Sequence, residues 1–169
     1  MTSINIQFSV SGAPRGKQRP RMVRRGRKTI TYTPIETKNY ERQIREGFLL
    51  SALRADLPLR GNLCIEVIAL FPRTKSLEFC YKDGRYKHGV GRLLMGVKPD
   101  GDNIMKCVWD GIGEYIDGGD SRVVHGAITK MYCGIGELPR TFVRIWGVSN
   151  LEDLLGVINL DWACGTIDA

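Results

Sequence analysis

The sequence predicts a single α+β domain of two layers, in which a small mixed β-sheet packs against two main helices. The chain has 169 residues, of which 43% are hydrophobic and 25% charged, as in one ordinary globular domain. Several short segments have the apolar pattern of strands, and two longer segments repeat their apolar residues at helical spacing. Read in order, the segments follow β-α-β-α-β-β, which favours a mixed sheet with helices on one or both faces.

The first half of the chain supplies a strand, a basic segment and a helix. Residues 4–10 alternate apolar and polar side chains, which is typical of a half-buried strand. Residues 20–33 include a stretch of strand-forming residues, and we expect a ragged hairpin there. A helix is predicted from Pro34 to about Leu53, because apolar residues recur at helical spacing before Pro58 ends the pattern.

The second half supplies the rest of the predicted sheet. Residues 63–71 form a largely apolar run, typical of a buried strand, and residues 72–99 follow as a long loop rich in Lys, Arg and Gly. A helix is predicted over residues 102–112, and strands over residues 122–132 and 141–146. No repeat and no linker divides the chain.

We therefore expect one domain over residues 1–149 and a tail over residues 150–169. The domain includes a basic arm at residues 14–28 and a variable loop at residues 72–97. The tail carries four Asp or Glu and no Lys or Arg among several apolar residues, which favours a short amphipathic helix or a docking segment. Packing on the domain, packing on a second subunit and shielding of the basic arm all remain open.

Positive charge is concentrated at the N-terminal end. Residues 1–60 carry 13 Lys or Arg and 4 Asp or Glu, whereas residues 61–169 carry 12 and 14. Gly and Pro interrupt the basic arm, so we expect a flexible or hairpin-like segment rather than a helix. A phosphate backbone is its natural partner, although a solvated charge run or an acidic protein partner would also fit. The candidate DNA-binding residues are Arg15, Lys17, Arg19, Arg21, Arg24, Arg25, Arg27 and Lys28.

Composition also excludes several classes of protein. The five cysteines are an odd number without a C-x-x-C pair, so we expect reduced thiols rather than a disulfide framework or a structural zinc. The longest apolar runs are far shorter than a membrane span, and the first residues lack the features of a secretory signal. We therefore expect a cytoplasmic protein with no membrane partner.

Acidic residues gather around the start of the second predicted helix. Asp100 and Asp102 lie in a turn with Pro99 and Gly101, where both carboxylates can point at one position, and Asp102 is placed near the N-cap of the helix. Lys106 follows Asp102 by one turn on the same face.

A second acidic patch spans residues 117–120, and Asp110 lies one further turn along the helix. Three carboxylates from two segments beside a lysine predict a Mg²⁺ site, because hard cations prefer carboxylate oxygens. A helix cap, a pair of turns and an exposed ion pair would explain the same residues without a metal.

With these motifs in view, the chain resembles the RusA-type Holliday junction resolvases. The resemblance covers about residues 4–147. Its most specific string is K-P-D-x-D-N followed by Lys and Asp. The matching residues are Val10–Pro14, Lys17–Arg21, Tyr32–Pro34, Lys98–Asn103, Lys106, Asp110, Asp120–Val123 and Lys130.

The resemblance implies a homodimer that binds branched DNA and cuts four-way junctions by paired symmetric nicks. It implies Mg²⁺ as the cofactor, with Mn²⁺ able to substitute, no small-molecule cofactor, and a bacterial or phage origin. By the same resemblance, Asp100, Asp102 and Asp120 are the catalytic, metal-binding carboxylates, and Lys106 is the essential lysine. Asn103 and Asp110 have supporting roles, with Asp110 supporting Lys106 rather than binding metal.

This chain departs from the family pattern near its third carboxylate. Gly119 replaces the first Asp of the usual pair, Arg122 replaces the usual Gln, and Asp117 becomes a rival ligand. We prefer Asp120, because it keeps the three-residue step to Val123. Two other functions remain open: a non-catalytic nucleic-acid-binding regulator on the same fold, and a broader flap or single-strand nuclease.

Overall fold

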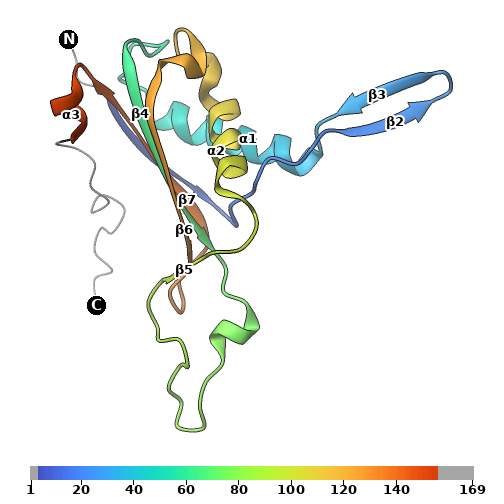
Figure 1. Cartoon of the computed structure of the whole chain (residues 1–169), viewed down its shortest axis with the longest axis vertical. Coiled ribbons are helices and arrows are strands. Elements are labelled where there is room, and N and C mark those ends of the chain that lie inside the picture. Colours follow the sequence, from blue (N-terminus) through green and yellow to red (C-terminus); the bar gives the residue numbers. More distant parts are fainter. Residues whose placement is uncertain (1–3, 156–169) are drawn as a thin grey trace.

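A five-stranded mixed sheet with two helices on one face forms the body of the protein, as seen in a computed structural model that describes residues 4–155 (Figure 1). The strand order is β1-β7-β4-β6-β5, in which β4 and β6 are parallel and the other neighbours antiparallel. The bounds are Asn5–Ser11 for β1, Asn62–Phe71 for β4, Leu93–Leu94 for β5, Val123–Tyr132 for β6 and Arg140–Val148 for β7. The predicted α+β class is confirmed.

Two helices cover one face of this sheet. Helix α1 (Ile35–Ser51) buries Tyr40, Ile44 and Phe48, which recur at helical spacing, and Phe48 packs edge-on against Phe8 of β1. Helix α2 (Gly101–Ile112) buries Ile104, Val108 and Ile112 in the same core. The alternating apolar residues predicted for β1 also lie in this core, so the main elements lie close to their predicted bounds.

The two helices cross at Gly111. A Cβ atom on this glycine would lie 2.7 Å from Cγ2 of Ile44 and 3.0 Å from the carbonyl oxygen of Glu41. The absence of a side chain therefore lets the helices approach closely.

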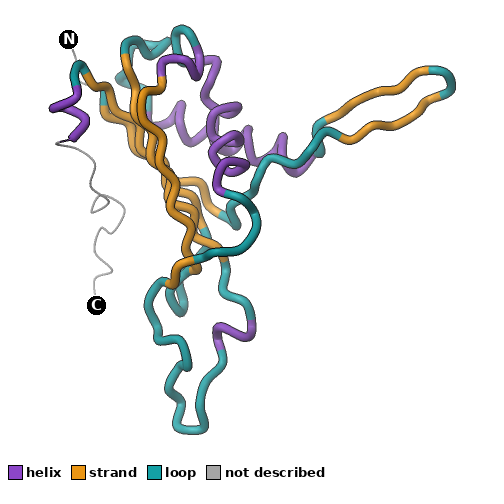
Figure 2. Tube along the Cα trace, in the orientation of Figure 1, coloured by secondary structure: helices purple, strands orange, loops and turns teal. Residues whose placement is uncertain are grey.

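Two segments project from this body (Figures 1 and 2). The first is a hairpin of β2 (Arg21–Arg25) and β3 (Lys28–Tyr32), whose residues are all exposed. The second is a finger, residues 72–92, which contains the 3-10 turn η1 (Lys75–Glu78) and leads into the short strand β5. The predicted hairpin is confirmed, whereas part of the predicted loop is ordered by η1 and β5.

The chain after β7 begins a helix, α3 (Leu151–Leu155). The rest of the predicted tail lies outside the described residues, and the boundary at residue 149 stays a prediction. Within residues 4–155, no helix combines the length and the hydropathy that a membrane crossing needs.

Candidate active site

The acidic motif lies where the chain enters α2, at the corner between the body and the hairpin. Asp100 is the N-cap residue of α2, and Asp102, which was predicted to lie near the N-cap, lies in the first turn. The Asp100 side chain makes no capping hydrogen bond, although this is the usual reason for an Asp at such a position. Its exposed carboxylate is therefore available for another partner.

Asp102 is paired with Lys106. The Nζ atom of Lys106 donates to Oδ2 of Asp102 at 3.0 Å, across one turn of the helix, and both side chains are more than half exposed. This hydrogen bond lowers the pKa of the Asp102 carboxyl below its ordinary value. The Asp102 carboxylate is therefore ionised throughout the neutral range, as a metal ligand must be.

Lys130 holds the loop that carries the motif. From β6, its Nζ atom donates to the carbonyl oxygens of Val97 at 2.6 Å and Pro99 at 2.8 Å. The same loop is bonded to β6 through the Met95 N–H, which donates to the Lys130 carbonyl at 3.1 Å. From the sequence, Lys130 was only a basic residue within the resemblance, because its positioning role depends on the pairing of β5 with β6.

The root of the basic arm lies against the same corner. The Lys17 N–H donates to the Asn103 carbonyl at 2.8 Å, so the contact of Asn103 with the arm is made by its backbone. A Cβ atom on Gly16 would lie 3.0 Å from Cβ of Pro99, so the arm passes directly over the motif. This contact places the basic segment beside Asp100 and Asp102.

Two of the eight candidate DNA-binding residues contact acids of the body. Arg15 Nη1 lies 2.5 Å from Oε2 of Glu36, and Lys17 forms an ion pair with Asp110. The other six candidates, Arg19, Arg21, Arg24, Arg25, Arg27 and Lys28, are exposed beyond this root.

Asp110 contacts Lys17 rather than Lys106, which it was expected to support. The hydrogen bond from Lys17 to Asp110 raises the pKa of the lysine, and Glu41 lies 4.0 Å from the same Nζ atom. Partial burial raises the pKa of Glu41. These three residues anchor the arm to both helices, which sequence spacing could not indicate.

In the folded chain, Asp120 lies far from Asp100 and Asp102. It belongs to the 3-10 turn η3 (Gly119–Arg122), which contacts η2 (Gly113–Tyr115) at the C-terminal end of α2. Helix α2 runs antiparallel to β6, since Gly101 approaches Ile128 and Trp109 approaches Gly126. A helix of this length spans about 18 Å, so Asp100 and Asp120 lie near opposite ends of it.

One chain accordingly gathers only part of the predicted metal site. Within residues 4–155, no three His, Cys, Asp or Glu side chains lie close enough together to hold a metal ion. Asp100 and Asp102 form an adjacent pair, and Asp120 is exposed at a separate position.

The rival third ligand, Asp117, already has a partner. Its Oδ2 atom lies 3.7 Å from Nε of Arg60, whereas the Asp120 side chain makes no hydrogen bond or ion pair with the part of the chain that the structure describes. Gly118 and Gly119 have positive φ angles of 85° and 65°, a region that favours glycine. The departure from the family pattern at Gly119 therefore has a backbone reason.

Comparison with known proteins identifies the family of this chain. Residues 11–146 match the family described as Endodeoxyribonuclease RusA. The chain is also 31% identical over 144 residues to YqaN of Bacillus subtilis (strain 168), itself described as uncharacterized, with 85% of this chain and 97% of YqaN covered. The family match includes the hairpin, the finger, both helices and the whole acidic motif. The chain therefore belongs to the RusA endodeoxyribonuclease family.

Proposed function

We propose that this protein is a Mg²⁺-dependent, structure-selective endodeoxyribonuclease that resolves four-way DNA junctions by paired symmetric nicks. The observation that carries the proposal is the exposed corner at the start of α2. There, Asp100 occupies the N-cap position without capping, and Asp102 is paired with Lys106 beneath a basic arm. A residue needed only as a helix cap would use its side chain on the helix.

The donor set of this corner fits Mg²⁺. The ion commonly binds proteins through one or two carboxylates, keeps several waters and completes its shell with substrate phosphate oxygens. Asp100 and Asp102 supply two exposed carboxylates two residues apart. When bound, the metal would lower the pKa of a water and neutralise charge on the scissile phosphate.

The other residues of the corner have distinct roles in this proposal. Lys106 holds the Asp102 carboxylate in place and adds a positive charge where negative charge develops on the phosphate. The exposed cations of the hairpin bind the backbone of the DNA, because phosphate contacts position a nucleic acid without reading its sequence. Burial raises the pKa of the nearby Cys107 thiol to about 12, so this cysteine is no nucleophile near neutral pH.

We propose that a second copy of the chain supplies Asp120. A two-fold axis that pairs two α2 helices in antiparallel fashion would bring Asp120 of each copy toward Asp100 and Asp102 of the other. Two observations on residues 4–155 support this arrangement: the Asp120 side chain has no hydrogen-bond or ion-pair partner there, and no three potential ligands come together there to hold a metal ion. A symmetric dimer would also present two active sites to a two-fold symmetric junction.

The direct test is cleavage of a labelled synthetic four-way junction with and without Mg²⁺, beside matched duplex and flap substrates. We expect paired nicks on the junction alone. Asp102→Asn should abolish cutting and leave binding intact or tighter, whereas Asp56→Asn, which changes an exposed carboxylate between α1 and β4, should cut normally. Cutting of all substrates would favour the broader nuclease, and binding without cutting in Mg²⁺ or Mn²⁺ would favour the regulator.

Subunit mixing tests the shared site. Asp102→Asn and Asp120→Asn should each be inactive alone. If Asp120 acts on the other copy, a mixed dimer retains one complete site and should nick one strand of the junction. If all three carboxylates act within one chain, both sites of the mixed dimer are defective and mixing restores nothing.

A further inference from the structure

The finger is a folded projection with its own hydrogen bonds. At its tip, the Tyr81 N–H donates to the Arg85 carbonyl at 2.9 Å, and the Lys87 N–H donates to the Phe79 carbonyl at 3.0 Å. The Asp83 carboxylate accepts from the Arg85 N–H at 3.0 Å and closes the turn between them. The tip is therefore a small hairpin that holds its side chains in a defined arrangement.

A buried arginine fixes the base of the finger. Arg73 is only 9% exposed, and its guanidinium donates to four carbonyl oxygens. The acceptors are Cys133 at 2.8 Å, Gly89 at 2.9 Å, Leu77 at 3.3 Å and Gly91. Arg73 thereby connects both sides of the finger to Cys133, the residue that follows β6.

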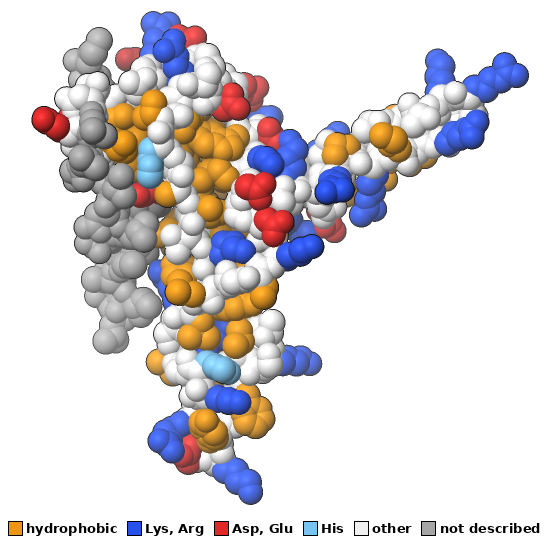
Figure 3. All heavy atoms as spheres, viewed as in Figure 1, with side chains coloured by type: hydrophobic (Ala, Val, Ile, Leu, Met, Phe, Trp, Pro, Cys, Tyr) orange, Lys and Arg blue, Asp and Glu red, His pale blue; other side chains and the backbone are white. Residues whose placement is uncertain are grey.

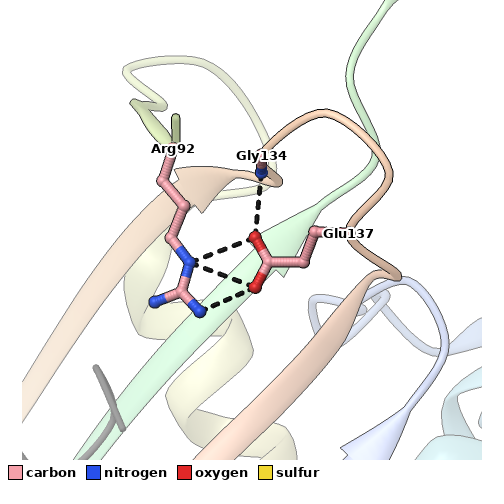
Figure 4. A network of polar contacts seen from close by, with 3 residues as sticks. All are labelled: Arg92, Gly134 and Glu137. Carbon is pink, nitrogen blue, oxygen red and sulfur yellow. Dashed lines mark hydrogen bonds and ion pairs between the residues drawn. The ribbon is translucent and has the colours of Figure 1, made fainter. Parts of the chain in front are cut away.

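A second contact fixes the outgoing strand of the finger. Arg92 donates to both carboxylate oxygens of Glu137, with Nη2 at 2.6 Å from Oε1, and Glu137 also accepts from the Gly134 N–H at 2.8 Å (Figure 4). Both charged side chains are about four-fifths buried, and such bidentate pairs are geometrically specific. The finger is therefore held out from the body at a fixed base.

The tip presents aromatic rings that have no core to cover them. Phe79 is 60% exposed and Tyr81 is 51% exposed, on a segment that otherwise consists mainly of polar and basic residues. Residues 72–92 carry six Lys or Arg and two Asp or Glu. Figure 3 shows Lys and Arg side chains over both projections, and acidic and basic side chains gathered on the body beside the root of the hairpin.

We propose that the finger tip binds unpaired bases at the branch point of DNA, with Phe79 and Tyr81 stacking on base faces and Lys82 and Lys87 contacting the adjacent phosphates. This inference rests on the proposed function and names a second DNA contact for it. Aromatic rings set among cations favour a single-stranded partner, because every base has a face to stack on and every nucleotide carries a phosphate. The net positive charge of the finger opposes its pairing with the same finger of a second copy.

The position of the finger agrees with this assignment. The loop that enters α2 lies between the finger and the hairpin, so the two projections flank the candidate active site (Figure 1). Only seven residues separate Arg92 from Asp100, and Met95 is bonded to β6 between them. A junction arm held by the hairpin would therefore leave the branch point near the finger.

The test compares binding of the full-length wild-type chain and of Phe79→Leu/Tyr81→Leu in Ca²⁺, which should allow binding without cleavage. The ligands are a four-way junction with two unpaired nucleotides at the branch and a duplex of equal length. The variant removes ring faces but keeps charge and apolar character. We expect roughly tenfold or greater weakening on the junction, no change on the duplex and an unchanged salt dependence. Leu53→Ala, at an exposed apolar site beyond α1, is the matched control.

The outcomes separate this inference from the proposed function. Equal binding of the variant and the wild type to the junction would overturn the role of the finger, even if the wild type cuts junctions normally. Equal weakening on junction and duplex would also overturn it, and so would a changed sedimentation coefficient, which would make the rings a subunit contact. If the wild type binds the junction through these rings but does not cut it in Mg²⁺, the proposed function fails and the finger contact stands.

Discussion

The two projections of this protein carry the same sign of charge but are built in different ways. The hairpin is a two-stranded ribbon joined to the body by ion pairs at its root, chiefly those of Arg15 and Lys17. The finger is joined by the buried guanidinium of Arg73 and by the Arg92–Glu137 pair. An exposed ion pair contributes little to the free energy of unfolding. Removing a buried arginine costs more, because its hydrogen-bond acceptors are left without a donor.

This difference suggests a division of labour on DNA. An isolated two-stranded hairpin is only marginally stable in water, so the hairpin can adapt to a backbone that its cations hold. The finger presents aromatic rings from a fixed base, as stacking on a particular nucleotide requires. We therefore expect the hairpin to dominate salt-dependent affinity and the finger to dominate preference for unpaired bases.

Removal of hairpin charge should have the largest effect. Replacing Arg19, Arg21, Arg24 and Arg25 with Gln should make the slope of log affinity against log salt less negative by about three to four. This corresponds to roughly a thousandfold to ten-thousandfold weaker binding at 0.1 M salt. Titration of a four-way junction at several salt concentrations measures it. The same change at Lys38, Arg42, Arg54 and Arg60 is the control, and an unchanged slope in the hairpin variant would show that it does not contact phosphate.

Loss of the buried arginine should have the next largest effect. Arg73→Met leaves the carbonyl oxygens of Leu77 and Gly89, one on each side of the finger, without their donor, and we expect about 3 kcal/mol less resistance to local opening of the finger. Hydrogen exchange at the Tyr81 and Lys87 amides measures this opening. Arg54→Met, at an exposed site, should leave exchange unchanged, and equal protection in both variants would contradict the anchoring role of Arg73.

The stability that the Arg92–Glu137 pair gives to the finger should depend on pH. The hydrogen bonds from Arg92 lower the pKa of Glu137 below its ordinary value of 4.5, so the folded state favours the carboxylate. The pair therefore stabilises the protein above pH 4.5 and loses this contribution as the pH falls through the lowered pKa. Thermal unfolding of wild type and Glu137→Gln from pH 7 to pH 3 should show curves that converge at the acid end. If the wild-type and Glu137→Gln curves stay parallel down to pH 3, the pair does not stabilise the protein through the ionised carboxylate.

Loss of a hairpin anchor should have the smallest effect on stability. Arg15→Ala removes an exposed ion pair with Glu36, and we expect the free energy of unfolding to fall by less than about 1 kcal/mol. Chemical denaturation measures it. A loss as large as that of Arg73→Met would remove the contrast between the two projections.

Local pattern determined much of this fold. The alternation in β1 and the helical spacing in α1 and α2 each predicted an element close to its observed bounds, because these patterns mark which side chains face a core. The hairpin was also predictable, since Gly and Pro interrupt the basic segment and strand-forming residues follow it. The sequence of the finger predicts only a loop, because its order comes from Arg73 and Glu137, which contact distant residues.

The sequence by itself determined the class of fold, the family and the residues Asp100, Asp102, Lys106 and Asp120 as candidates, because short motifs carry that information. Only the tertiary structure decided how they are placed. Asp100 occupies the N-cap position of α2, but its side chain makes no capping hydrogen bond. Asp110 forms an ion pair with Lys17, and Asp120 lies in η3, near the C-terminal end of α2. These facts depend on the crossing of α1 and α2 and on the antiparallel course of α2 over β6, which are set by contacts between residues far apart in the chain.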